Sequence, residues 1–146
     1  MNRRYPTFTN ASECVKCANE PSHEFIHGLE QFNRGEFFEQ HETLEEIWIA
    51  EKDDVRSLYK GILQIGVGYF HLFERKNYHG ATVKLASGCR WLQAFQPHCM
   101  GVEVTRLIED AKRSLAALRE LGPERITEFD RRLVAKVRYS RKRGNG

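Results

Sequence analysis

Helical spacing of the apolar residues constrains the fold of this chain more than any other feature. Apolar side chains recur three and four residues apart along almost the whole sequence, as in Phe25, Leu29 and Phe32. No stretch shows the sustained alternation or the hairpin dipeptides that are typical of β-strands. The sequence therefore predicts an all-α protein.

Turn signals divide this pattern into five or six helices with short connections. We expect a first helix from Pro21-Ser22 to the turn Asn33-Arg34-Gly35, and later ones over about 36–50, 54–75, 78–95, from 104 to at least 118, and from 123 to about 137. Lys52-Asp53-Asp54 indicates a turn and an N-cap, and Asn77 a second cap. The 54–75 segment is apolar around most of its circumference, which is typical of a central, buried helix.

A weak internal repeat adds to this picture. Ile26, Leu29 and Phe32 correspond to Val67, Phe70 and Phe73 at an offset of 41 residues. In each copy an apolar helix meets a tight turn and a second helix, as in tetratricopeptide-like helical hairpins. Because two copies are too few for a solenoid, we predict a compact bundle built from helical hairpins.

Length and charge indicate how the chain is organised. A chain of 146 residues fits one domain, which we place at 21–137, between an N-terminal extension at 1–20 and a basic tail at 138–146. Residues 131–146 hold seven Lys/Arg and no acids, whereas residues 1–130 hold 16 Lys/Arg and 20 Asp/Glu. An acidic body repels a phosphate backbone, so we expect a small ligand or a protein partner rather than nucleic acid, with RNA contact through the tail as a weaker hypothesis.

The distribution of apolar residues indicates in which cellular compartment the protein resides. The longest uncharged stretch, 61–73, is shorter than the roughly 20 apolar residues of a membrane helix, so no membrane span is predicted. The opening MNRRYPTFTNASEC has no apolar segment of the secretory type. We expect a cytoplasmic protein.

Two segments carry a family resemblance. They are Phe32-Asn-Arg-Gly-Glu-Phe-Phe-Glu-Gln-His-Glu-Thr-Leu-Glu-Glu-Ile-Trp48 and Leu63-Gln-Ile-Gly-Val-Gly-Tyr-Phe-His71. They resemble the pattern F-N-x-G-x-F-x-E-x-H-E-x-L-E-x-x-W and the aromatic-His pair of the helical family called domain of unknown function 309. The resemblance covers about residues 25–95 and implies a compact helical fold without an assigned reaction.

A polar set interrupts the apolar faces of the second and third predicted helices. Its candidate ligand or metal residues are His41, Glu42, Glu45, Gln64 and His71, with Glu39, Trp48 and Arg56 as supporting residues. His41 and Glu45 are four residues apart, as are Gln64 and Gly68, so each pair shares a helix face. If the two helices pack antiparallel, these faces meet and could hold zinc or iron through imidazole and carboxylate.

Two interpretations of this set remain open. In one, the protein binds a metal ion or small ligand there, with hydrolytic activity as an extension. In the other, the set is a buried hydrogen-bond network in which Arg56 neutralises Glu42 or Glu45, and the protein is a tetratricopeptide-like interaction module. In both, Phe38 and Trp48 belong to the core. Glu39, Gln40 and Glu46 face water, although Glu39 could reach a cavity mouth.

A second candidate metal site lies near the N-terminus. Cys14-x-x-Cys17 and His23-x-x-x-His27 have zinc-compatible spacing. The alternative is a pair of reduced surface thiols beside two exposed imidazoles. Cys89 and Cys99 lack such spacing, and no disulfide is expected in a reducing compartment.

Overall fold

A computed structural model describes residues 5–141, and its architecture is an all-α bundle, as predicted. The long helices are α1 (His23–Asn33), α2 (Phe37–Ala50), α3 (Arg56–Phe70), α4 (Tyr78–Leu92) and α5 (Val104–Leu121). A π-helical turn, η3 (His71–Arg75), extends α3, and a 3-10 turn, η4 (Gln93–Phe95), extends α4. The predicted helices over 54–75 and 78–95 are thus present with altered last turns.

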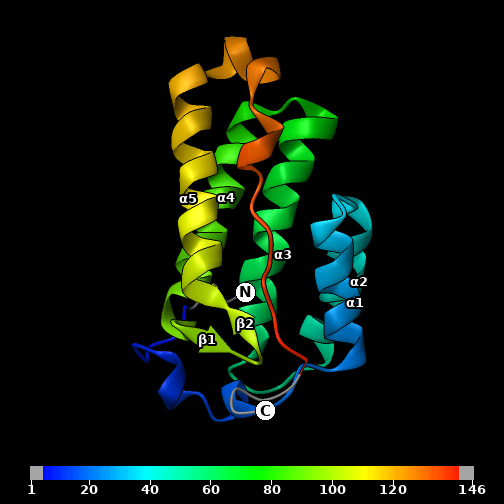
Figure 1. Cartoon of the computed structure of the whole chain (residues 1–146), viewed down its shortest axis with the longest axis vertical. Helices are drawn as coiled ribbons and strands as arrows, with labels where there is room; N and C mark the ends of the chain where they lie inside the picture. Colours follow the sequence, from blue (N-terminus) through cyan, green and yellow to red (C-terminus); the bar gives the residue numbers. More distant parts are fainter. Residues whose placement is uncertain (1–4, 142–146) are drawn as a thin grey trace.

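The helices pack in chain order, each against the next (Figure 1). The α1–α2 hairpin lies on one side of α3, and α4 and α5 lie on the other. Ile62, Ile65 and Tyr69 of α3 are fully buried, which confirms α3 as the central helix. It packs closely on α4, because a Cβ added at Gly61 would lie 2.6 Å from the Leu92 side chain.

Side-chain caps begin two of the five long helices. Ser22 Oγ accepts the backbone N–H of Phe25 at 3.1 Å, and Asn77 Oδ1 accepts that of Gly80 at 2.9 Å. The N-cap predicted at Asp53-Asp54 is wrong: α3 begins at Arg56, and no cap side chain accepts a hydrogen bond. Instead, the backbone carbonyls of Asp53 and Asp54 accept the N–H groups of Arg56 and Ser57 in a tight turn.

The sixth helix, predicted from 123 to about 137, is present only in part and as 3-10 helix. After α5 come two short 3-10 helices, η5 (Pro123–Glu128) and η6 (Arg131–Leu133), and then an extended segment. That segment runs back along the bundle between α5 and α1 (Figure 1). Its backbone groups bond to other elements rather than to each other: Ala135 N–H donates to Tyr69 Oη at 3.0 Å, and Val137 N–H to Asn33 Oδ1 at 2.7 Å. With these partners, the segment satisfies its polar backbone without forming a helix.

The N-terminal and C-terminal segments meet at a small sheet at one end of the bundle (Figure 1). Strands β1 (His98–Cys99) and β2 (Val102–Glu103) pair antiparallel, and Val102 forms a further bridge with Tyr139. The N-terminal 3-10 helices η1 (Ala11–Glu13) and η2 (Val15–Ala18) lie beside this sheet. Ahead of them, the Phe8 ring packs edge-on against Phe95 at 5.3 Å between centroids.

Part of the predicted basic tail contacts the bundle. Arg138 pairs with Asp110 at 3.0 Å, and Arg141 with Glu30 at 2.9 Å. Residues 142–146, which carry the rest of the proposed RNA contact, lie outside the described residues. Within the described part, no helix is both long and apolar enough to cross a membrane.

Candidate functional site

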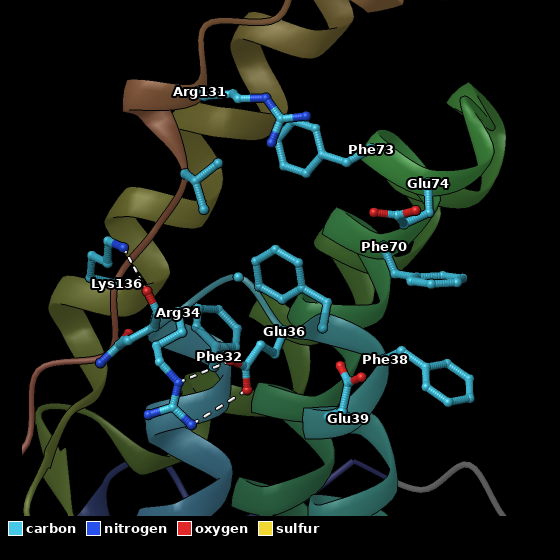
Figure 2. A pocket seen from close by; sticks show the side chains of 14 residues that line it. Phe32, Arg34, Glu36, Phe38, Glu39, Phe70, Phe73, Glu74, Arg131 and Lys136 are labelled. Atoms are coloured by element: carbon cyan, nitrogen blue, oxygen red, sulfur yellow. Dashed lines mark hydrogen bonds and ion pairs between the residues drawn. The ribbon is translucent and has the colours of Figure 1, made fainter.

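A pocket of about 520 Å³ opens at the turn between α1 and α2 (Figure 2). We call it the turn pocket. Its lining comes from that turn, from the ends of α2 and α3, and from the C-terminal segment: Phe32, Asn33, Arg34, Gly35, Glu36, Phe37, Phe38, Glu39, Phe70, Phe73, Glu74, Arg131, Val134 and Lys136. A volume of this size suits a small organic molecule.

The sequence Asn33-Arg34-Gly35 builds the turn. Gly35 has φ +80°, a conformation that glycine adopts without strain, and its N–H donates to the Phe32 carbonyl at 3.0 Å. The reversal brings Phe32 and Phe37 together edge-on, with ring centroids 5.4 Å apart. Both rings anchor the inner wall of the pocket in the core.

Basic groups occupy one side of the turn pocket. Arg34 pairs with Glu36 at 3.1 Å, and Lys136 Nζ donates to the Asn33 carbonyl at 2.7 Å. Arg131 stacks on the Phe73 ring, with its guanidinium carbon 4.0 Å from the ring centroid. For Arg131, the described part of the chain offers no carboxylate partner.

Acidic and aromatic groups occupy the other side. Figure 2 shows Glu39 beside Phe38 and Glu74 above Phe70, across the pocket from Arg34 and Lys136. Among residues 5–141, neither Glu39 nor Glu74 forms an ion pair. The core position predicted for Phe38 is wrong: its side chain is 52% exposed and its ring lies 6.0 Å from that of Phe70.

The predicted polar set is spread over α2, α3 and the π-helical turn that follows α3. Glu42 is exposed, His41 and Glu45 are half-buried, Gln64 is buried and His71 is half-buried. Phe38 lies opposite Phe70, and the Lys60 ammonium lies 4.3 Å from the Trp48 ring centroid, so α2 and α3 run antiparallel. In the part of the chain described, no hydrogen bond or ion pair joins members of the set, and their ligand atoms do not form a close metal-binding group.

His71 lies where α3 passes into the π-helical turn, and its ring faces the start of α4. A Cβ added at Gly80 would lie 2.9 Å from its Cγ. Burial, with the positive charges of Lys84 and Arg75, holds the pKa of His71 below its ordinary value. Both His71 Nδ1 and Gln64 Oε1 are buried without a hydrogen-bond partner.

The polar side chain that does enter the α2–α3 interface is Gln40, which was predicted to face water. It is fully buried, and its Nε2 donates to the Leu63 carbonyl at 3.4 Å. A Cβ at Gly66 would overlap its amide, so the two helices approach here because Gly66 has no side chain. The sequence signal for this contact was the position of Gln40 between Phe37 and Leu44 on one helical stripe.

The supporting residues take different places. Glu39 lines the turn pocket, and Trp48 is half-buried beneath two cations. Arg56, expected to neutralise Glu42 or Glu45, instead donates to the backbone carbonyl of Glu51 at 3.1 Å and stacks on Trp48 at 4.9 Å. Its guanidinium therefore ties the end of α2 to the start of α3.

The cysteines depart from the sequence prediction. Cys17 forms a disulfide with Cys99, so the expectation of reduced thiols without a disulfide is wrong for this pair. Cys14 is a buried free thiol whose pKa is raised by burial. His23 and His27 do not join the cysteines: they line a separate cavity of about 170 Å³ with Glu30 and Arg141.

Together, the fold and the pocket define a small helical bundle with a charged, aromatic pocket at its first interhelical turn. Residues 25–83 match the family model described as Domain of unknown function (DUF309). The resemblance inferred from the motifs is thereby confirmed over these residues, which include the turn and both walls contributed by α2 and α3. No curated protein matches the chain.

Proposed function

We propose that this protein binds a small organic ligand in the turn pocket. The observation that carries the proposal is the convergence of the motif Phe32-Asn-x-Gly-x-Phe-x-Glu39 on one cavity. Every fixed position of that motif lines the pocket. A motif that only closed a helical turn would not need to place the Glu39 carboxylate at a cavity wall.

Opposed charges indicate the chemistry of the ligand. Arg131 and Lys136 can receive a carboxylate through charge-assisted hydrogen bonds, and Glu39 and Glu74 can receive an ammonium group. The exposed faces of Phe38 and Phe70 suit an apolar or aromatic group between the two ends. A zwitterion of the amino acid or short peptide class fits this arrangement.

The proposal concerns binding rather than catalysis. None of the lining side chains is a Ser, Thr, Cys, Tyr or His that could act as a nucleophile or an imidazole base. Selective recognition by fixed charges across a cavity requires none of them.

A binding screen tests this function. Amino acids and dipeptides would be added to the purified protein, and the shift of its melting temperature measured, followed by calorimetric titration of any ligand found. We expect Arg131→Ala and Glu74→Gln each to weaken binding by about tenfold or more, since each removes a charge-assisted contact. Both side chains are exposed, so the fold should persist.

Arg125→Ala is the matched control, because Arg125 is an exposed arginine that pairs with Glu128 away from the pocket. It should leave the affinity unchanged. If no member of the panel shifts the melting temperature, or if the Arg125 and Arg131 variants lose binding equally, the proposed site is wrong.

A second candidate function is the metal site predicted between α2 and α3, and one observation on the α3 side bears on it. Gln64 Oε1 and His71 Nδ1 are buried without a hydrogen-bond partner, as are Gln31 Oε1 and Gln40 Oε1 elsewhere, and a bound ion would give the first two a partner. To hold a zinc or iron ion with His41 and Glu45 of α2, the His71 ring would have to turn from the start of α4, which it faces. Elemental analysis of the wild type and of His41→Ala tests this: metal lost in the variant supports the site, and equal metal content in both contradicts it.

A further inference from the structure

Three sulfur atoms gather where the N-terminal segment crosses the connection between α4 and α5. The Sγ atoms of Cys14, Cys17 and Cys99 lie within 4.8 Å of one another, and the latter two form the disulfide. Cys99 is fully buried, Cys14 is 5% exposed and Cys17 is partly buried. Neither the turn pocket nor the metal site predicted between α2 and α3 includes these residues.

Local structure aligns the first two sulfurs. Cys14 is the N-cap of the 3-10 helix η2, and Cys17 N–H donates to the Cys14 carbonyl at 3.1 Å. A 3-10 helix has three residues per turn, so side chains three apart lie on the same side. The C-x-x-C spacing therefore presents both sulfurs in one direction.

Backbone hydrogen bonds, and not the disulfide alone, bring the third sulfur to them. Met100 N–H donates to the Cys17 carbonyl at 2.8 Å, and Ala11 N–H donates to the Gln96 carbonyl at 2.8 Å. These bonds join the N-terminal segment to the residues on both sides of Cys99. Breaking the disulfide would leave them in place.

We propose that Cys14, Cys17 and Cys99 bind one zinc ion when the disulfide is reduced. In a tetrahedral site with Zn–S bonds of about 2.3 Å, ligand sulfurs stand about 3.8 Å apart, which lies within the spread of this group. Rotation about the side-chain bonds of Cys17 and Cys99 would provide that separation. Water would take the fourth position, as in zinc sites with three protein ligands.

Disulfide and metal exclude each other at this site. A dithiol reductant supplies two electrons and two protons, which convert the Cys17–Cys99 bond into two thiols, and the reductant becomes a disulfide. Zinc then binds three thiolates, and three protons pass to solvent. The site would therefore hold zinc only under reducing conditions.

The histidine ligands first predicted for this motif have no role here. His23 and His27 lie in their own cavity, and His98 is exposed on the strand where its neighbour Cys99 is buried. Cys99 takes their place as the third ligand, 82 residues from Cys17 in the sequence.

Metal analysis of the full chain tests the proposal. Protein reduced with a phosphine would be loaded with Zn²⁺ alone, desalted without chelator and analysed for zinc, alongside protein kept oxidised. Reduced wild type should retain one zinc ion per chain, and oxidised wild type about tenfold less. Cys14→Ser and Cys99→Ser should each lower retention by about tenfold, because each removes a ligand.

Cys89→Ser is the control, since Cys89 is also a buried free cysteine but lies on α4 outside the group. His41→Ala is a second control. If the His41→Ala variant loses zinc and the Cys99→Ser variant retains it, the cysteine site is wrong and the metal site predicted between α2 and α3 is supported instead. The experiment is independent of the turn pocket, whose ligand screen uses other residues.

A measurement on the wild type covers the case in which a serine variant fails to fold. Zinc should protect Cys14, Cys17 and Cys99 of the reduced chain from alkylation, as read by mass spectrometry, and should leave the modification of Cys89 unchanged. Replacement of Zn²⁺ by Co²⁺ should add a sulfur-to-cobalt charge-transfer band. Equal alkylation with and without zinc, or a Co²⁺ spectrum without that band, would refute the proposal.

Discussion

At the scale of single residues, the Tyr69 hydroxyl connects three elements of the fold. Its oxygen lies 2.8 Å from Ser114 Oγ on α5 and accepts the Ala135 N–H of the C-terminal segment at 3.0 Å. Its burial raises the pKa of Tyr69 to about 12, so the hydroxyl stays protonated at neutral pH. A single buried group thus determines how α3, α5 and the last segment meet.

We expect Tyr69→Phe to lower the free energy of unfolding by about 1–3 kcal/mol, because it leaves the Ala135 N–H buried without a partner. Urea denaturation measures this. Tyr78→Phe is the matched control, as the structure of residues 5–141 gives Tyr78 no side-chain hydrogen bond. Equal stability of Tyr69→Phe and wild type would show that the hydroxyl network contributes nothing.

His71 should make stability depend on pH. Since its pKa is lower in the folded chain than in the unfolded one, the unfolded chain binds the proton first as the pH falls through about 6.5. The free energy of unfolding therefore decreases in that range, and His71→Gln should reduce the decrease. Denaturant titrations between about pH 7.5 and 5.5 measure how the free energy of unfolding depends on pH. Exposed His79→Gln is the control. Identical pH profiles for wild type and His71→Gln would contradict a role of His71.

At the scale of elements, α1 holds the extended C-terminal segment through one side chain. Asn33 Oδ1 accepts the Val137 N–H at 2.7 Å, and Asn33 Nδ2 donates to the Val137 carbonyl at 2.9 Å. These bonds also position the wall of the turn pocket, because Val134 and Lys136 precede Val137 in the same segment. The pocket thus depends on an association between residues far apart in the chain.

We expect Asn33→Ala to lower the free energy of unfolding by about 1–3 kcal/mol and to raise amide exchange at Val137, since both bonds are lost. Hydrogen exchange read by mass spectrometry over 134–139 measures the second effect. Asn77→Ala, which removes the α4 cap, should cost about 1 kcal/mol without local exchange at Val137. Similar amide exchange at Val137 in Asn33→Ala and Asn77→Ala would show that the Asn33 side chain does not hold the C-terminal segment.

At the scale of the whole molecule, the Cys17–Cys99 disulfide closes a long loop. It links the N-terminal segment to the sheet across a sequence separation of 82 residues, spanning α1 to α4. Such a link lowers the entropy of the unfolded chain, with a stabilisation of about 4.5 kcal/mol in the loop-entropy account and about 2–4 kcal/mol in typical measured cases.

Reduction in the presence of a chelator should therefore lower the free energy of unfolding by about 2–4 kcal/mol. Urea denaturation with and without reductant measures it, and Cys99→Ser, which has no Cys17–Cys99 bond, should not respond. A wild type whose stability is the same in both conditions would contradict the expectation.

The sequence predicted the elements that depend on interactions between residues close together in the chain. Apolar spacing located α1 to α5. The helix start near Pro21-Ser22 and the cap at Asn77 were predicted because each depends on residues within one turn. The last segment was predicted as helix because Gly122-Pro123 is a signal for a helix end followed by a helix start. Its real hydrogen-bond partners, Asn33 and Tyr69, lie about a hundred and about sixty-six residues away.

The features of the candidate site also fall into those that the sequence predicted and those that it did not. The sequence by itself determined an all-α chain, the turn at Gly35 and the motif that lines the pocket, because spacing and backbone preference are properties of neighbouring residues. Only the tertiary structure decided that Gln40 enters the core, that Phe38 faces solvent and that Cys99 meets Cys17. These outcomes depend on which surfaces the helices bury against one another, and helical periodicity cannot distinguish adjacent positions on a single stripe.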